Sequence, residues 1–250
     1  MSGPIELLFL LAAGVVAGVI GTAGGITSLV AYPALLAVGI PPLAANVTNS
    51  VALLGSGFGS ALRASPDLAG HRRTLQTWLP PTVLLSLGGA ALLVATPSGV
   101  FDRVVPFLVA AGSVILLLQP TITGWQERRG SRLGRGTVGL SGAGVALYNG
   151  YFGAGSGVLF IALMLLTTEP VLHRANALKN VILFAADLLP AVLFAVLGRV
   201  VWHAVWPLGV GALLGGLIGP SVARRVPARV LRPLIALCGL VLAVYLFVRV

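Results

Sequence analysis

Two ionisable residues lie eight positions apart inside a long apolar stretch, where a charge is costly. Lys179 is the only lysine in the chain, and Asp187 follows it by about two helical turns. An ionisable side chain within a membrane span is by default a functional residue. Lys179 could attract an anion, and Asp187 could take up a proton or pair with a basic group. The alternative for Lys179 is that its long stem carries the charge to the membrane interface.

Two polar clusters begin apolar segments at corresponding places in the two halves of the chain. The clusters are Asn46, Thr48, Asn49 and Ser50, and then Asn176, Lys179 and Asn180. Amide NH₂ and hydroxyl groups can donate hydrogen bonds to the oxygens of a sulfonate or another oxyanion. The alternative is hydrogen bonding between helices, worth about 1 kcal/mol for each bond. Asn46 and Asn176 occupy the same place in "ANVTNSV" and "ANALKNV", which favours binding for these two.

Glycine-rich runs interrupt two apolar segments, as "GTAGG" at 21–25 and "GAGSG" at 153–157. A helix that breaks inside the membrane exposes backbone N–H groups, and these groups attract an anion together with the helix dipole. Close helix packing by small residues is the alternative, but two matched runs favour a site. The predicted substrate-binding residues are Gly21, Thr22, Gly24, Gly25, Asn46, Thr48, Asn49, Ser50, Gly153, Gly155, Ser156, Gly157, Asn176, Lys179 and Asn180, with Asp187 as the candidate for coupling.

The composition indicates that helices embedded in a bilayer position these residues. Hydrophobic residues make up 57% of the 250 residues, charged residues make up 9%, and the mean hydropathy is +1.02. A soluble domain of this length could not solvate such a surface. The net charge of +10 comes from arginines in short loops, which indicates membrane orientation and not nucleic-acid binding. The sequence therefore predicts an all-α polytopic membrane protein.

Ten apolar segments are expected, and the basic loops orient them. The segments are 5–21, 26–39, 44–62, 75–96, 101–118, 137–153, 157–167, 171–197, 202–221 and 230–248. Segments 26–39 and 157–167 are too short to cross a bilayer comfortably, so each could form a re-entrant hairpin with the segment before it. The basic loops contain Arg63, Arg72 and Arg73, then Arg128, Arg129, Arg132 and Arg135, and finally Arg224, Arg225 and Arg229. Basic loops belong in the cytoplasm, so both termini are expected on the outer side of the cytoplasmic (inner) membrane.

The chain also repeats itself. Gly18, Gly21 and Gly25 match Gly150, Gly153 and Gly157, and Gly88, Gly89, Pro106 and Gly112 match Gly215, Gly216, Pro233 and Gly239. The matches divide the chain into a first transmembrane repeat at 1–120, a basic cytoplasmic linker at 121–136 and a second transmembrane repeat at 137–250. Each half has an odd number of crossings, so the second half would be inverted relative to the first. Inverted repeats with interrupted helices are typical of secondary transporters.

The glycine runs and their surroundings resemble one known family. The stretch "GVVAGVIGTAGGITSLVAYPALLAVGIPPLAANVTNS" looks like the first signature of the sulfite exporter TauE/SafE family of permeases, and "NGYFGAGSGVLF" with "RANALKN" looks like its second-half counterpart. Ala23 and Ser156 depart from the glycine pattern. The resemblance implies export of a small sulfur oxyanion or an organosulfonate across the cytoplasmic membrane.

We therefore expect a secondary transporter with a small anionic substrate, alternating access and proton or ion coupling. The alternative is a small-cation or metal permease, in which Asp187 and unwound carbonyl groups bind the ion. A membrane-embedded enzyme is less favoured, because His71, His173 and His203 have no metal-ligand spacing and Cys238, the only cysteine, has no neighbouring base. No cofactor and no metal site are expected. The sequence indicates neither the substrate itself nor an oligomeric state.

Overall fold

A computed structural model describes residues 3–129, 135–197, 199–223 and 228–249, and it is helical without strands over these residues. The first half contains α1 (Pro4–Gly24), α2 (Thr27–Ala37), α3 (Pro42–Ala52), α4 (Leu54–Ala64), the 3₁₀ helix η1 (Ser65–Leu68), α5 (Arg72–Ala95) and α6 (Ser98–Arg129). The second half contains α7 (Arg135–Tyr151), α8 (Ser156–Thr167), α9 (Leu172–Leu197), α10 (Trp202–Ala223) and α11 (Ala228–Arg249). The prediction of an all-α polytopic membrane protein is confirmed.

The expected segments agree with these helices except at two places. Segment 44–62 is divided into α3 and α4 at Leu53. Helix α6 continues to Arg129, well beyond the apolar segment that ends at 118, so part of the predicted linker 121–136 is helical. Residues 130–134 of that linker lie outside the described residues.

Five helices of the described chain are long and apolar enough to cross a membrane. They are Pro4–Thr22, Arg72–Ala95, Ser98–Leu118, Leu172–Leu197 and Trp202–Gly219. Helices α2 and α8 are apolar but only 11 and 12 residues long. At about 1.5 Å of rise per residue, neither helix spans about 30 Å of hydrocarbon.

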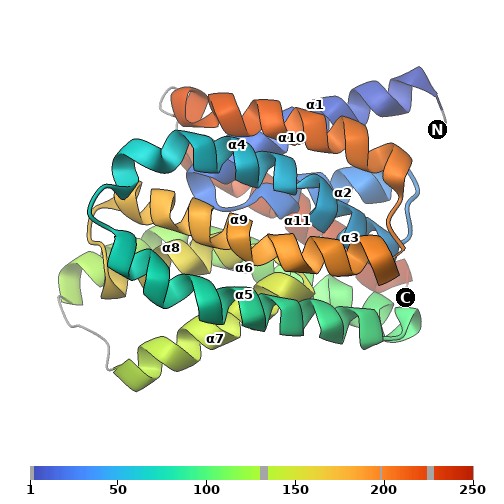
Figure 1. Cartoon of the computed structure of the whole chain (residues 1–250). Helices are drawn as coiled ribbons and strands as arrows, with labels where there is room; N and C mark the ends of the chain where they lie inside the picture. The colour runs from blue at the N-terminus through green and yellow to red at the C-terminus, as the bar shows by residue number, and fades with distance from the viewer. Residues whose placement is uncertain (1–2, 130–134, 198, 224–227, 250) are drawn as a thin grey trace.

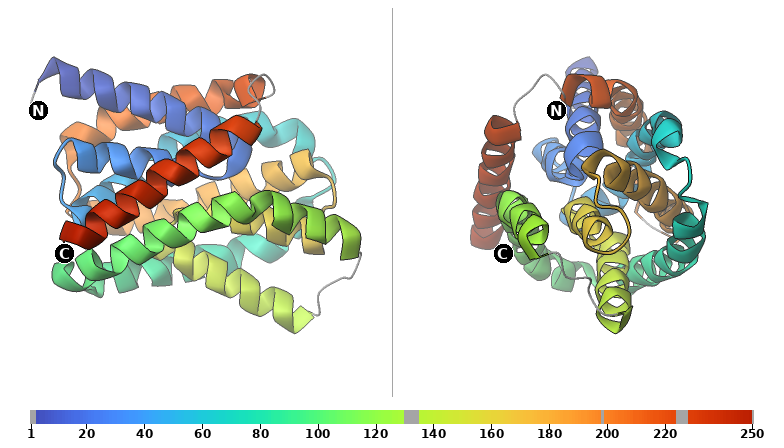
Figure 2. Two further views of the ribbon diagram at one scale, coloured as in Figure 1. Left: turned by 180° about the vertical axis from the view of Figure 1, so that it is seen from behind. Right: turned by 90° about the vertical axis from the view of Figure 1, so that its left-hand side faces the viewer.

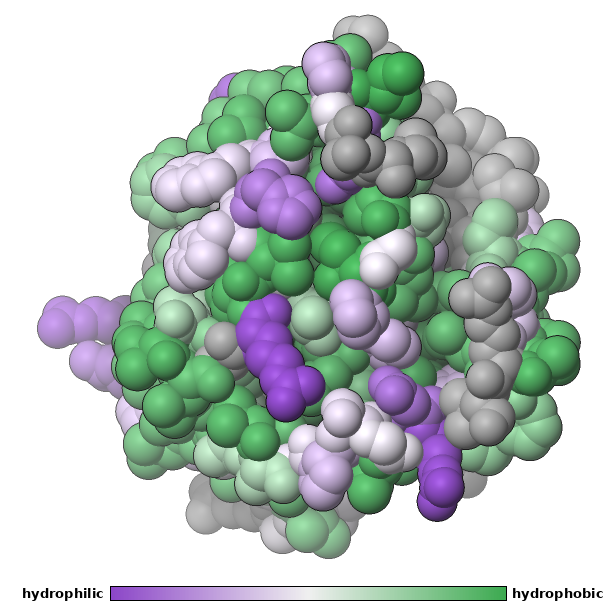
Figure 3. Space-filling model, turned by 90° about the vertical axis from the view of Figure 1, so that its right-hand side faces the viewer, coloured by the Kyte–Doolittle hydropathy of each residue, from purple (hydrophilic) through white to green (hydrophobic). Residues whose placement is uncertain are grey.

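The helices run roughly along one common direction, and the two ends of the bundle differ (Figures 1 and 2). The turn between α4 and α5, the end of α6 and the end of α10 lie at one end, where the basic loops belong in sequence. Helix α1 begins and α11 ends at the opposite end, which Figure 3 shows face-on with hydrophilic side chains among apolar ones. The helix ends next to the basic loops therefore lie together at one end of the bundle, and the side of the membrane that this end faces stays a prediction.

Glycine brings helices of the two halves into close contact. Helix α1 packs on α10, where a Cβ on Gly18 would lie 2.9 Å from the carbonyl carbon of Gly215. Helix α7 packs on α5, where a Cβ on Gly89 would lie 2.9 Å from the backbone nitrogen of Tyr151. Helix α4 contacts α10 as α9 contacts α5, and α6 contacts α11. These matched pairs are the ones that a two-fold relation between the halves would give, and the inverted repeat stays a prediction.

The buried core lies where the short helices meet the long ones. Tyr32 of α2, Phe101 of α6, Phe152 after α7 and Phe194 of α9 are almost fully buried. Large apolar side chains such as Leu140 and Val196 are instead more than 70% exposed at the outer surface. An apolar exterior around a packed interior is what a bilayer requires of a helical bundle.

Candidate functional site

Both glycine runs interrupt a helix. Helix α1 ends at Gly24, and Gly25 adopts a left-handed conformation with φ 72° before α2 begins. Helix α7 ends at Tyr151, and both Gly153 and Gly155 have positive φ before α8 begins. Only glycine takes up such angles at little cost, so the sequence itself places the breaks.

The two breaks touch each other. A Cβ added to Gly25 would lie 2.6 Å from the carbonyl carbon of Gly157, and a Cβ added to Gly157 would lie 2.6 Å from the Cα of Gly25. Two backbones approach this closely only when neither residue has a side chain. The meeting of the two interrupted stretches, expected from the matched glycines, is therefore present in the structure.

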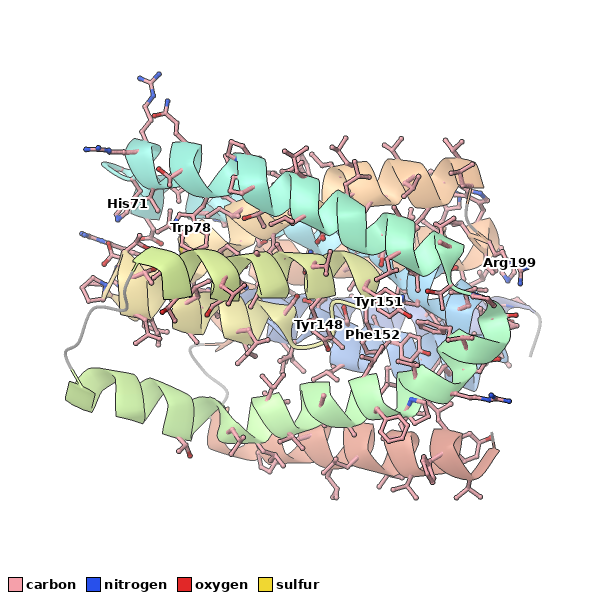
Figure 4. All side chains as sticks on the ribbon, turned by 90° about the horizontal axis from the view of Figure 1, so that it is seen from below. His71, Trp78, Tyr148, Tyr151, Phe152 and Arg199 are labelled. Atoms are coloured by element: carbon pink, nitrogen blue, oxygen red, sulfur yellow. The ribbon has the colours of Figure 1, made fainter. Side chains whose placement is uncertain are left out.

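Aromatic and hydroxyl groups hold the second break in place (Figure 4). The Tyr148 hydroxyl donates a hydrogen bond to the carbonyl oxygen of Ala154 at 2.6 Å. The Phe152 ring lies edge-on to the Tyr32 ring with 5.4 Å between centroids, and it also contacts Phe101. The loop between α7 and α8 is thus tied to α2 and α6.

A cavity of about 100 Å³ lies beside the touching breaks. The first half contributes Gly21, Thr22, Gly25, Thr27, Ser28, Asn49, Ser50, Leu53, Ser56, Gly57 and Ser60. The second half contributes Asn149, Phe152, Gly153, Ser156, Gly157, Lys179, Asn180, Leu183, Phe184 and Asp187. The first turns of α2 and α8 therefore both border the cavity, and first turns carry backbone N–H groups without intrahelical partners. Most of the predicted site residues come together here.

Lys179 lies in the wall of this cavity and is buried, with 3% of its surface exposed. Across the described residues, no carboxylate lies within 4.0 Å of its amine, since the ion pairs found there all involve histidines. The side chain is buried inside the helix bundle, which disfavours the alternative of a lysine that extends to the membrane interface. A buried ammonium group without a counter-ion needs an anionic or strongly polar neighbour.

Asp187 is joined to a polar chain that crosses between helices. The Asn149 amide donates to the Asp187 carboxylate at 2.6 Å and to the Ser86 hydroxyl at 3.2 Å. The Ser156 hydroxyl donates to the amide oxygen of Asn149 at 2.6 Å. Asn149 thus links α9 to α5 and to the start of α8. The expectation that Asp187 pairs with a basic group is not met among the described residues.

Sequence reasoning missed several cavity residues. Asn149 is the first residue of the quoted "NGYFGAGSGVLF" run, but it has no polar counterpart in the first half to draw attention to it. Ser56 and Ser60 follow Asn49 at spacings of seven and eleven, which are the spacings that share one face of a continuous helix. That spacing was the signal that could have found them.

Four predicted site residues do not line the cavity, and the surroundings of a fifth, Gly24, lie outside what the structure describes. Asn46 donates to the carbonyl oxygen of Tyr151 at 3.0 Å, and Asn176 donates to that of Thr22 at 2.8 Å. The Thr48 hydroxyl accepts a hydrogen bond from the backbone N–H of Val201 at 3.0 Å, and Gly155 precedes α8 without lining the cavity. The amide NH₂ groups of Asn46 and Asn176 thus each donate to a backbone carbonyl at the end of the other half's broken helix, and the binding role favoured for the two residues stays a prediction.

The three histidines pair with carboxylates at the ends of the bundle. His71 binds Glu169 at 2.5 Å and so joins the loop before α5 to the loop before α9. His173, in the first turn of α9, lies 3.9 Å from Asp67 of η1, and His203 lies 3.6 Å from Glu6 at the other end. Among the described residues, no cluster of three or more His, Cys, Asp or Glu side chains could hold a metal ion.

Glu169 titrates abnormally in this setting. Burial alone would raise the pKa of its carboxyl, but the Val171 N–H and the His71 ring donate hydrogen bonds that lower it. The charges of His71 and Arg174 lower it further, and the net pKa lies below the ordinary value. Glu169 is therefore held as a carboxylate at the junction of the two loops.

Comparison with known proteins places the chain in a family. The sequence pattern described as sulfite exporter TauE/SafE matches residues 7–246, which is nearly the whole chain. The chain belongs to the TauE/SafE family. It is therefore a multi-pass membrane transporter, and family membership agrees with the expectation that it is not an enzyme.

Several curated proteins are similar to this chain over almost its full length. A probable membrane transporter protein, ORF9, from a Sinorhizobium species is 28% identical over 96% of this chain and 92% of its own length. A probable membrane transporter protein from Haemophilus influenzae is 27% identical over 93% of this chain and 91% of its own length. YfcA of Escherichia coli K12, also named a probable membrane transporter protein, is 24% identical over 97% of this chain and 90% of its own length. No solved structure matches the chain.

Proposed function

We propose that the chain exports a small oxyanion, sulfite or an organosulfonate, through the cavity between the two helix breaks. The observation that carries the proposal is the position of Lys179, a buried amine without a carboxylate within 4.0 Å among the described residues, in the wall of that cavity. The first turns of α2 and α8 add oriented backbone dipoles of the same sign. The hydroxyl and amide groups of Ser28, Asn49 and Asn180 supply further donors.

The size of the cavity favours a small substrate. Pockets for drug-sized ligands typically enclose about 300–1,000 Å³. A cavity of about 100 Å³ holds only a few heavy atoms. Sulfite therefore suits this conformation better than a longer organosulfonate, which would need the cavity to widen.

We assign proton coupling to Asp187 as part of the same proposal. Its carboxylate lines the cavity with Lys179, so an incoming anion would be repelled by an ionised Asp187 and tolerated by a protonated one. The Asn149 amide keeps one carboxylate oxygen fixed while the second stays available to a proton. Proton uptake with the anion would then lower the cost of bringing it into the membrane.

Alternating access would follow from movement of one half against the other, with the basic loops in the cytoplasm and both termini outside. Transporter sites lie near the bilayer midplane at the interface of two repeats. The touching breaks contribute one helix start from each half to a single cavity. A rocking movement would expose that cavity to each side in turn.

Binding and transport measurements on two variants test the proposal. Sulfite, sulfate, thiosulfate and taurine are titrated into detergent-purified protein by calorimetry, and sulfite flux is followed in proteoliposomes with an imposed pH gradient. Lys179→Met should abolish sulfite binding, whereas Asp187→Asn should retain binding and lose the effect of the pH gradient on flux. Arg199→Gln, at an exposed helix end, is the control and should leave both readouts unchanged.

Three results would overturn the proposal. The first is a flat titration with all four anions. The second is sulfite binding that survives Lys179→Met. The third is flux of a small cation that depends on Asp187 and not on Lys179, which would favour the cation permease.

A further inference from the structure

Helices α5 and α7 are in close contact at one end of their interface. A Cβ on Gly150 would lie 2.6 Å from the carbonyl carbon of Ser86, and a Cβ on Gly89 would lie 3.0 Å from that of Leu147. The small residues let the two backbones meet. This contact lies toward the C-terminal end of α7, close to the second helix break.

Toward the start of α5 the same two helices separate. Gly139 of α7 has no neighbouring atom within 4 Å of an added Cβ, although it faces the same helix as Gly150 does. A half-open groove of about 610 Å³ fills the space between residues 77–85 of α5, residues 138–143 of α7 and the end of α8 at 166–168. This groove is several times larger than the cavity between the breaks.

The walls of the groove are mainly apolar. Val138, Ala143, Leu85 and Leu166 line it, together with the indole of Trp78. The Trp78 ring packs edge-on against Phe160 with 5.6 Å between centroids, and a Cβ on Gly142 would lie 2.8 Å from its Cζ3 atom. The indole is thus fixed in the wall, near the end of the bundle that also carries His71 (Figure 4).

Two arginines precede the groove-lining part of α5 by about one helical turn. Arg72 and Arg73 begin α5 and are exposed. The Thr77 hydroxyl, which lines the groove, donates to the carbonyl oxygen of Arg73 one turn earlier. No acidic residue is among the described residues that line the groove. The apolar groove therefore begins about one helical turn from two positive charges. Basic residues and tryptophan are both common where a membrane helix meets the lipid headgroups.

We propose that this groove binds one acyl chain of an anionic phospholipid, with the headgroup held by Arg72 and Arg73. The groove is separate from the cavity between the breaks, so lipid binding does not depend on the transported substrate. The apolar walls suit a hydrocarbon chain and not an oxyanion. A second copy of this protein is a poorer occupant, because it would bring its own two arginines next to Arg72 and Arg73. The phosphodiester of an anionic lipid instead neutralises the two charges. The bound lipid would fill the gap between α5 and α7 and support the α8 end beside the loop at Glu169.

Native mass spectrometry of the full chain tests the proposal. Detergent-purified protein is titrated with phosphatidylglycerol and, separately, with phosphatidylcholine of the same acyl chains. We expect phosphatidylglycerol to bind about tenfold more tightly, because two arginines near a membrane surface favour an anionic headgroup by at least that factor. Gly139→Trp should fill the groove and weaken binding of both lipids about tenfold.

Matched variants make the outcome specific. Gly144→Trp, on the same helix and equally open but outside the groove, should leave binding unchanged. The double variant Arg72→Gln, Arg73→Gln should bind both lipids equally. The control double variant Arg103→Gln, Arg199→Gln, at the opposite end of the bundle, should keep the preference for phosphatidylglycerol. The arginine pair is exposed, so this test stands even where Gly139→Trp fails to fold. Equal binding by Gly139→Trp and Gly144→Trp, an unchanged headgroup preference in the double arginine variant, or conversion of a dimer to a monomer by Gly139→Trp would overturn the proposal.

Discussion

The side-chain amide of Asn46 donates a hydrogen bond to the backbone carbonyl of Tyr151 across 105 residues of sequence. Asn176 does the same for Thr22, so each half supplies one asparagine to the broken helix of the other half. The last carbonyls of a helix have no intrahelical partner, and inside a bilayer no water replaces it. The two asparagines therefore stabilise the ends of α1 and α7.

Removing either asparagine should destabilise the protein. Asn46→Leu and Asn176→Leu each leave a buried carbonyl without its donor, at an expected cost of about 1–3 kcal/mol. Thermal unfolding in detergent measures the loss. Ser113→Ala is the control, because the buried Ser113 hydroxyl bonds only to Val109 of its own helix, and it should change the melting temperature much less. Equal melting temperatures for Asn46→Leu and Ser113→Ala would contradict this role.

The contact between the breaks should not tolerate a methyl group. Gly157→Ala places a Cβ 2.6 Å from the Cα of Gly25, and relieving such an overlap typically costs about 1–3 kcal/mol or more. We expect a lower melting temperature and reduced sulfite flux. Gly144→Ala, in the middle of α7 with open space around it, should instead be neutral or slightly stabilising. Full activity of Gly157→Ala would show that the two backbones do not meet.

The polar chain around Asn149 should respond in a graded order. Asn149→Ala removes three hydrogen bonds and leaves Asp187 without its donor, Ser156→Ala removes one short bond, and Ser86→Ala removes one long bond. Flux in proteoliposomes should therefore fall most for Asn149→Ala and least for Ser86→Ala. The opposite order would mean that the hydrogen bond of Asn149 to Ser86 of α5 matters for flux and that its bonds to cavity residues do not.

The Glu169 carboxylate makes stability depend on pH. Its pKa is lower in the folded protein than the ordinary value of 4.5, so its contribution is fully present above that pH. The contribution is lost as the pH falls through the folded-state pKa. Melting temperatures from pH 7 to pH 3 should therefore show a gap between the natural protein and Glu169→Gln that narrows on acidification. Asp67→Asn, at a more exposed carboxylate 3.9 Å from His173, should show little gap at any pH.

Much of the fold could be predicted because bilayer burial imposes strong patterns on sequence. Long apolar segments, glycine interruptions and short partners at 26–39 and 157–167 indicated the helices and their breaks. The division at Leu53 was not foreseen, because the residues around it remain apolar and no proline marks it. The extension of α6 was not foreseen either, because the stretch after 118 is polar and the apolar criterion stops there.

The cavity was harder to predict than the helices. Lys179 and Asp187 stand out, since charge is rare in a membrane span. Asn46 and Asn149 are chemically alike, and only the fold distinguishes the residue that supports a helix end from the one that lines the cavity. Which side of a helix faces a cavity depends on packing with helices distant in sequence, and a single sequence does not contain that information.

Lys179 also allows the cavity to be labelled through its amine, because no other side chain of this chain carries a primary amine. Because the chain has a single lysine, an amine-specific reagent can modify only this side chain and the amino terminus. Adding a membrane-impermeant reagent to one face of sealed vesicles, and then to the other, would show from the modification rate which compartment reaches the cavity.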